Sequence, residues 1–69
     1  MEFKLNGQEY IELNSLLKLL GLVESGGQAN MVIDNEEVKV DGHIETRRRK
    51  KLRDGEQVQF DGKTIAIKA

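Results

Sequence analysis

The sequence VKVDGHIETRRRKKLR, residues 38–53, is the stretch around which we expect the rest of the chain to be arranged. It begins as a strand in which apolar and polar residues alternate, turns at Asp41-Gly42 and resumes at His43-Ile44. Six of the seven residues from Arg47 to Arg53 are cations, and only Leu52 in this basic run could enter a hydrophobic core. The stretch therefore predicts a hairpin that presents concentrated positive charge to an anionic partner.

Charge is distributed unevenly along the chain. The formal net charge is −1, from eleven Lys and Arg residues against twelve Asp and Glu residues. Without the basic run, five basic residues would remain against all twelve acidic ones. An otherwise acidic body with one basic segment is typical of a local polyanion-binding surface. The alternatives are a solvated surface loop, or a run that the protein's own carboxylates neutralise.

Length and composition predict one small domain, residues 1–69, without cross-links. Cysteine is absent, so neither a disulfide framework nor a Cys-ligated metal site is available. No apolar run approaches the roughly 18 residues of a membrane span, and the start MEFKLN lacks the features of a signal peptide. We therefore expect a cytoplasmic monomer that does not bind membranes.

Two short helices are predicted before the hairpin. Leucines at i, i+3, i+4 and i+7 form one stripe over residues 13–20, with Asn14 or Ser15 near the helix start and Gly21 placed to end it. A second helix is expected from about Gly26 to Asn35. Its start has the capping-box spacing, Ser25 followed three residues later by Gln28. The two glycines after Ser25 would let a phosphate approach this helix start, or would simply form a loop between packed helices.

Strands are predicted on both sides of the helices. Asn6-Gly7 indicates a hairpin between an N-terminal strand and a short return strand near Tyr10. After the basic run, turns at Asp54-Gly55 and Asp61-Gly62 separate two further strands. The order is β-β-α-α-β-β-β-β at most, which predicts an α+β fold with two short helices packed on a small, mostly antiparallel sheet.

The register of the central hairpin presents a choice. A two-residue loop would place Lys39 opposite Ile44 and Val40 opposite His43, so that apolar side chains would be scattered over both faces. An odd loop with a bulge would pair Val38 or Val40 with Ile44 and gather them on one face. We predict the odd loop.

The sequence contains no recognisable catalytic constellation. The serines have no histidine near them in sequence, the acidic pairs indicate a solvated face, and no phosphate-loop or dinucleotide motif is present. His43 stands alone beside a turn, without a second metal ligand near it. Phe3 and Phe60 alternate with polar residues and are expected in the core, whereas Tyr10 is undecided, so base stacking is not the expected mode of binding. We predict a non-enzymatic protein without a metal or cofactor.

Four ordered segments resemble the RNA-binding domain named after small-subunit ribosomal protein S-four, also called the αL motif. They are LLKLLGL at 16–22, SGGQA at 25–29, VKVDG at 38–42 and DGEQV at 54–58. The resemblance covers about residues 13–60, with extra strands at both ends, and is greatest to short stand-alone bacterial proteins. It implies two helices beside a bent sheet, with the second helix and the following hairpin forming the RNA surface.

The candidate RNA-binding residues combine this resemblance with the basic run. They are Lys18, Ser25, Gly27, Gln28, Lys39, Asp41, Gly42, Arg47, Arg48, Arg49, Lys50, Lys51 and Arg53. Many members of the family carry Ser-Arg where this chain has Ser25-Gly26-Gly27, which removes one phosphate contact that the basic run would have to replace.

The leading hypothesis is a non-catalytic binder of structured RNA, of the ribosomal or transfer RNA class, acting alone or in a ribosome or RNA-processing complex. One alternative is a protein-interaction module whose basic run docks on an acidic partner. Another is a ubiquitin-like carrier domain. That class needs a C-terminal Gly-Gly, whereas this sequence ends Ile67-Lys68-Ala69.

Overall fold

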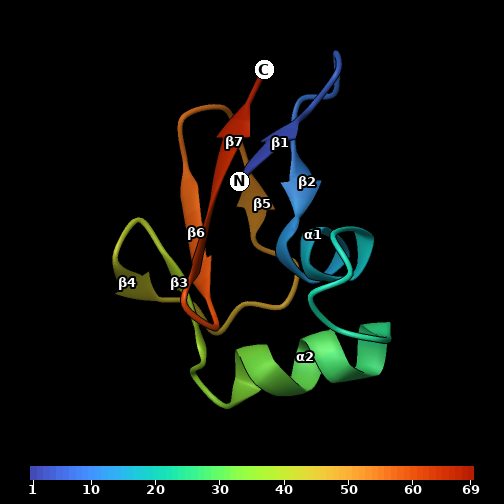
Figure 1. Cartoon of the computed structure of the whole chain (residues 1–69), viewed down its shortest axis with the longest axis vertical. Coiled ribbons are helices and arrows are strands. Elements are labelled where there is room, and N and C mark those ends of the chain that lie inside the picture. The colour runs from blue at the N-terminus through green and yellow to red at the C-terminus, as the bar shows by residue number, and fades with distance from the viewer.

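The computed structural model describes residues 1–69 as two helices and seven short strands (Figure 1). The elements are β1 (Glu2–Lys4), β2 (Ile11–Glu12), α1 (Leu13–Leu19), α2 (Gly26–Asp34), β3 (Val38–Val40), β4 (His43–Ile44), β5 (Lys51–Leu52), β6 (Gln57–Phe60) and β7 (Lys63–Lys68). Five strands form one sheet in the order β1-β7-β6-β3-β4, antiparallel except for β1 and β7. Strands β2 and β5 form a second, antiparallel sheet. The predicted α+β fold with a mostly antiparallel sheet is confirmed.

Both helices arise where local sequence predicted them. The apolar stripe of α1 buries Leu13, Leu16 and Leu17, and Gly21 beyond its end has φ 71°. Helix α2 begins after Ser25, whose Oγ accepts a hydrogen bond from the Gln28 N–H at 3.1 Å. Neither helix has the length and apolar character that crossing a bilayer requires.

One hydrophobic core of fifteen buried side chains lies between the helices and the sheets. No charged or polar residue is buried in it. Leu52 is fully buried, as expected for the one apolar residue of the basic run. Phe3 and Phe60 are half-buried and pack against the core. Thirteen of these side chains come from both helices and from strands of both sheets, and the loop residues Leu5 and Val23 complete the core, which therefore joins all these elements.

The predicted N-terminal hairpin is wrong. The turn itself forms, because Asn6 and Gly7 have φ values of 53° and 90°. The strands on either side of it do not pair with each other: β1 lies parallel to β7, whereas β2 pairs with β5 (Figure 1). Just before the turn, the Leu5 N–H donates to the Lys68 carbonyl at 2.7 Å, and Leu5 enters the core. An Asn-Gly pair determines the local turn, but each strand's partner depends on which distant backbone the core brings to it.

The central hairpin also differs from the prediction. Lys39 lies opposite Ile44 and Val40 opposite His43, across a two-residue loop. Asp41 and Gly42 have φ values of 51° and 82°, the conformation of a tight turn that matches the twist of adjacent strands. The odd loop was predicted to keep Ile44 on the apolar face. Ile44 does not need to lie on the apolar face, because β4 is a two-residue edge strand whose side chains are both exposed.

The structure has one strand more than the six that the sequence predicted. This additional strand is β5, which lies inside the basic run, where the sequence suggested no strand. It pairs Leu52 with Ile11 and Lys51 with Glu12. Pairing with β2 gives the short β5 its backbone hydrogen bonds, while Leu52 points into the core. The basic run is therefore part of the folded framework.

Candidate nucleic-acid interface

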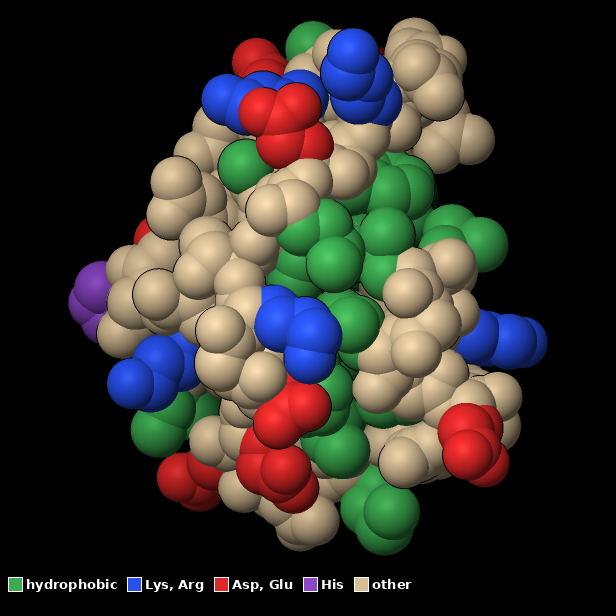
Figure 2. Space-filling model, viewed as in Figure 1, with side chains coloured by type: hydrophobic (Ala, Val, Ile, Leu, Met, Phe, Trp, Pro, Cys, Tyr) green, Lys and Arg blue, Asp and Glu red, His purple; other side chains and the backbone are tan.

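Positive charge does not dominate the surface as a whole. On the face shown in Figure 2, Lys and Arg side chains are scattered among acidic ones, and apolar side chains occupy the middle. This pattern agrees with a formal net charge of −1. A site for a polyanion must therefore depend on where the basic run places its side chains.

The backbone of the basic run is tied to the start of α1. The N–H of Leu13 donates to the Lys50 carbonyl at 2.9 Å, and that of Asn14 donates to the Arg48 carbonyl at 3.0 Å. The first turn of a helix has N–H groups without partners inside the helix, and here no side chain caps it. Carbonyls from the basic run fill that role, instead of the Asn14 or Ser15 side chain that the sequence suggested. The run is thus held in place through its backbone, while five of its six cationic side chains are exposed.

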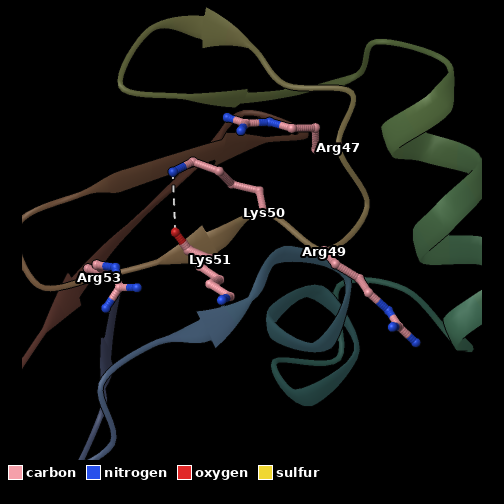
Figure 3. A pocket seen from close by; sticks show the side chains of 5 residues that line it. All are labelled: Arg47, Arg49, Lys50, Lys51 and Arg53. Atoms are coloured by element: carbon pink, nitrogen blue, oxygen red, sulfur yellow. Dashed lines mark hydrogen bonds between the residues drawn. The ribbon is translucent and has the colours of Figure 1, made fainter.

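An open pocket lies over this segment, and every residue that lines it is a cation (Figure 3). The five residues are Arg47, Arg49, Lys50, Lys51 and Arg53. In Figure 3 the side chain of Arg49 points away from the other four, so the cations spread over a broad area. Like charges around one pocket repel one another, and a bound anion offsets that repulsion. The pocket is therefore suited to an extended, negatively charged ligand.

Two arginines of the run are engaged by carboxylates of the protein. Arg47 donates from Nε and Nη2 to Glu45 at 2.9 and 3.1 Å, and Arg48 makes the same paired contact with Asp34 at the end of α2. Hydrogen bonds from the arginines lower the pKa of both carboxyl groups, and the same contacts raise the pKa of Arg47 and Arg48. Both arginines are exposed, so a phosphate could replace the carboxylate.

The other cations of the run fall into two groups. Lys50 Nζ lies 3.3 Å from Glu56, in a half-buried ion pair. Arg49, Lys51 and Arg53 are exposed and form no ion pair. Self-neutralisation of the run therefore applies to three of its six cations. The remaining three keep their full charge free for a ligand.

Tyr10, undecided from the sequence, lies against two of these free cations. Lys51 Nζ is 5.0 Å and Arg53 Cζ 5.5 Å from the centre of its ring. Tyr10 is half-buried. Only the pairing of β2 with β5 brings it there, and no local spacing in the sequence indicated that pairing.

A second open pocket, the α2 pocket, connects α2 to the basic run. Its lining is Gly27, Asn30, Met31, Asp34, Asn35 and Arg48. Gly27 and Arg48, both candidates, thus share one surface. Ser25 and Gln28 do not line it, because they close the start of α2: the Glu24 N–H donates to Gln28 Oε1 at 2.7 Å. The half-buried Asn30 and the exposed Met31 and Asn35, which also line this pocket, were not singled out from the sequence.

The remaining candidates lie apart from both pockets. Lys18 is exposed in the last turn of α1, and Lys39 is exposed on β3. Asp41 Oδ1 accepts a hydrogen bond from the Gln57 N–H at 2.9 Å, which ties the hairpin turn to β6. Gly42 takes the positive φ that the turn requires. The structure thus assigns Asp41 and Gly42 a clear role in shaping the hairpin.

Comparisons with known proteins agree with this architecture. The S4 domain family matches residues 3–68. The protein YbcJ of Escherichia coli (strain K12) is 45% identical over 67 residues, which cover 97% of this chain and 96% of YbcJ. The solution structure of YbcJ has a TM-score of 0.75 at 44% identity, covering 99% of this chain and 86% of that one, and it is described as revealing an αL motif involved in RNA binding.

A more distant relative is the Bacillus subtilis (strain 168) protein named "Probable ribosome maturation protein RlbA". It is 37% identical over 54 residues, which cover 78% of this chain and 76% of RlbA. The family resemblance read from the four sequence segments is confirmed. On the match over residues 3–68 and the likeness to YbcJ, this chain belongs to the S4 domain family.

Proposed function

We propose that this protein is a non-catalytic RNA-binding protein that recognises structured RNA of the ribosomal or transfer RNA class. The observation that carries the proposal is the pocket lined only by cations, on a segment whose backbone is anchored to α1. Cations presented outward from an anchored backbone suit the closely spaced phosphates of a folded RNA. The proposal treats residues 1–69 as one domain that acts as a monomer.

The binding mode would depend on phosphate contacts more than on base stacking. Phe3 and Phe60 pack against the core and leave no open aromatic platform. Arg49, Lys51 and Arg53 would contact the RNA backbone first, because no carboxylate of the protein is paired with them. Arg47 and Arg48 would then exchange their carboxylates for phosphates, which a guanidinium can grip with two parallel hydrogen bonds.

The surface beside the cationic pocket would set the orientation of the bound RNA. Gly27 and Arg48 share the α2 pocket, so an RNA that lies along the basic run can also reach the first turns of α2. Lys39, exposed on β3, lies outside both pockets and would add a more distant contact from the same stretch, residues 38–53. The relatives support the choice of RNA: the YbcJ structure is described as an αL motif involved in RNA binding, and RlbA is named for ribosome maturation.

Fluorescence anisotropy with a labelled ribosomal RNA hairpin, and with a DNA hairpin of the same sequence, would test the proposal. We expect saturable binding that prefers RNA, because the A-form shape presents phosphates differently from B-form DNA. The change of Arg49→Glu with Lys51→Glu should abolish binding. The matched control, Lys4→Glu with Lys68→Glu, makes the same change in net charge on exposed residues of β1 and β7 and should largely retain binding.

Two results would contradict the proposal. One is no RNA binding at low salt. The other is an equal loss in the pocket variant and the control, since binding would then follow net charge alone. Binding of an acidic protein after nuclease treatment, without any RNA affinity, would favour the interaction-module alternative.

A further inference from the structure

We propose that Tyr10 is a positioning residue of the cationic pocket, whose ring holds Lys51 and Arg53 side by side so that both cations face the same stretch of RNA backbone. The inference rests on the proposed function, because it assigns a role within that same pocket. It goes beyond the S4 domain assignment, which covers residues 3–68 but gives Tyr10 no role.

The placement of Tyr10 follows from the two-stranded sheet. Ile11 pairs with Leu52, and both side chains are buried. Neighbouring residues of a strand point to opposite faces, so Lys51 and Arg53 both point outward. Continuing the antiparallel register by one residue places Tyr10 beside Arg53, on the same outward face. The sheet thus gives one aromatic ring and two cations a common surface.

The distances fit an attraction between the ring and both cations. Lys51 Nζ lies 5.0 Å and Arg53 Cζ 5.5 Å from the ring centre, within the range of about 6 Å over which a cation is attracted to an aromatic face. Tyr10 is half-buried, so the rest of the fold holds its ring. Two long, flexible side chains are therefore restrained by one rigid group.

A ring restrains a cation differently from a carboxylate. Glu45, Asp34 and Glu56 hold Arg47, Arg48 and Lys50, but they also cancel their charge. An aromatic ring carries no net charge, so Lys51 and Arg53 remain fully attractive to phosphate while they are ordered. Ordering them before binding reduces the conformational entropy that the complex would otherwise lose. The ring should therefore increase affinity without changing the number of phosphates contacted.

The test compares Tyr10→Phe with Tyr10→Leu in the full chain, using the same labelled RNA hairpin. Neither change alters the net charge of the protein at pH 7. We expect Tyr10→Phe to bind like wild type, and Tyr10→Leu to bind about fivefold more weakly, because binding would then have to order the Lys51 and Arg53 side chains that the ring no longer restrains. The slope of log affinity against log salt should stay the same, because every cation is still present. Circular dichroism would verify that both variants are folded.

Two further measurements separate positioning from a general structural role. In NMR spectra, the side-chain methylene protons nearest the Lys51 and Arg53 charges should be shifted upfield by the ring in wild type and Tyr10→Phe, and should return to ordinary positions in Tyr10→Leu. In a Lys51→Gln, Arg53→Gln background, Tyr10→Leu should cause no further loss of affinity. A loss that persists in that background would overturn the inference.

The inference would also be overturned if Tyr10→Leu bound as tightly as wild type, or if Tyr10→Phe bound as weakly as Tyr10→Leu. Failure of the proposed function gives a different pattern. In that case wild type would not bind RNA at all, whereas upfield shifts that only Tyr10→Leu removes would still support the ordering of Lys51 and Arg53 by the ring.

Discussion

Replacing Arg49, Lys51 and Arg53 by glutamine removes from the pocket the three cations that form no ion pair. All three side chains are exposed, so the change should leave the core intact. Each cation that neutralises a phosphate of a duplex contributes about 0.9 to the slope of log affinity against log salt. If all three contact phosphate, the slope of the variant should be shallower than that of wild type by about 2.7.

That slope difference has a large effect over an accessible range. Between 50 and 200 mM salt, a slope of about 2.7 corresponds to about a 40-fold change in affinity. The variant should therefore lose most of its affinity relative to wild type at low salt, and the two binding curves should approach each other as salt rises. Fluorescence anisotropy with a labelled RNA hairpin at four or five salt concentrations measures both slopes.

A charge-matched variant is the control. Lys4→Gln, Lys63→Gln and Lys68→Gln remove the same formal charge from exposed positions on β1 and β7, none of which lines the cationic pocket. They should lower affinity only slightly and leave the slope close to that of wild type. An unchanged slope in the pocket variant, or an equal change in the control, would refute the assignment of the phosphate contacts to this pocket.

Three other changes test the framework that supports the pocket. Leu52→Ala should lower the free energy of unfolding, measured by urea titration, by about 2–5 kcal/mol, because the Leu52 side chain is fully buried. The control Leu19→Ala, at a residue that is 68% exposed, should have little effect in the same titration. Ser25→Ala should cost about 1 kcal/mol by loss of the α2 cap, and an unchanged unfolding midpoint would contradict that role. Arg48→Gln should raise the pKa of Asp34 in an NMR titration, because the hydrogen bond from Arg48 lowers that pKa. The contribution of the Arg48–Asp34 pair to stability is present at neutral pH and is lost as the pH falls through the lowered pKa of Asp34. An unchanged titration of Asp34 would show that the pair does not persist in solution.

Local features of the fold were predictable because neighbouring residues determine them. The leucine stripe of α1 and the Ser25-Gln28 cap of α2 each need only the spacing of a few residues along a helix. The turn at Asp41-Gly42 was also foreseen, because these residue types tolerate positive φ. The register of the same hairpin was predicted wrongly, because the prediction assumed that Ile44 had to be buried. Exposure depends on the position of β4 at the sheet edge, which no local pattern shows.

Part of the candidate site was likewise predictable from the sequence, and part was not. The basic run is evident from the sequence, since six cations in seven residues need no structure to be seen. Their separation into paired and free cations is not evident, because Arg48 meets a carboxylate fourteen residues away at the end of α2. Nor could the sequence place Tyr10, whose contacts with Lys51 and Arg53 depend on a strand pairing across most of the chain.

The sequence by itself determined the two helices, the Ser25 cap of α2, the turns and the location of the basic run, because these depend on residue type and short-range spacing. Only the tertiary structure decided that β1 lies beside β7, that β2 pairs with the basic run, and that backbone carbonyls of the run close the start of α1. Those contacts join residues far apart in the chain. They form because burying Leu5, Ile11 and Leu52 in one core brings their backbones together, and the same burial turns Lys51 and Arg53 outward onto a common surface.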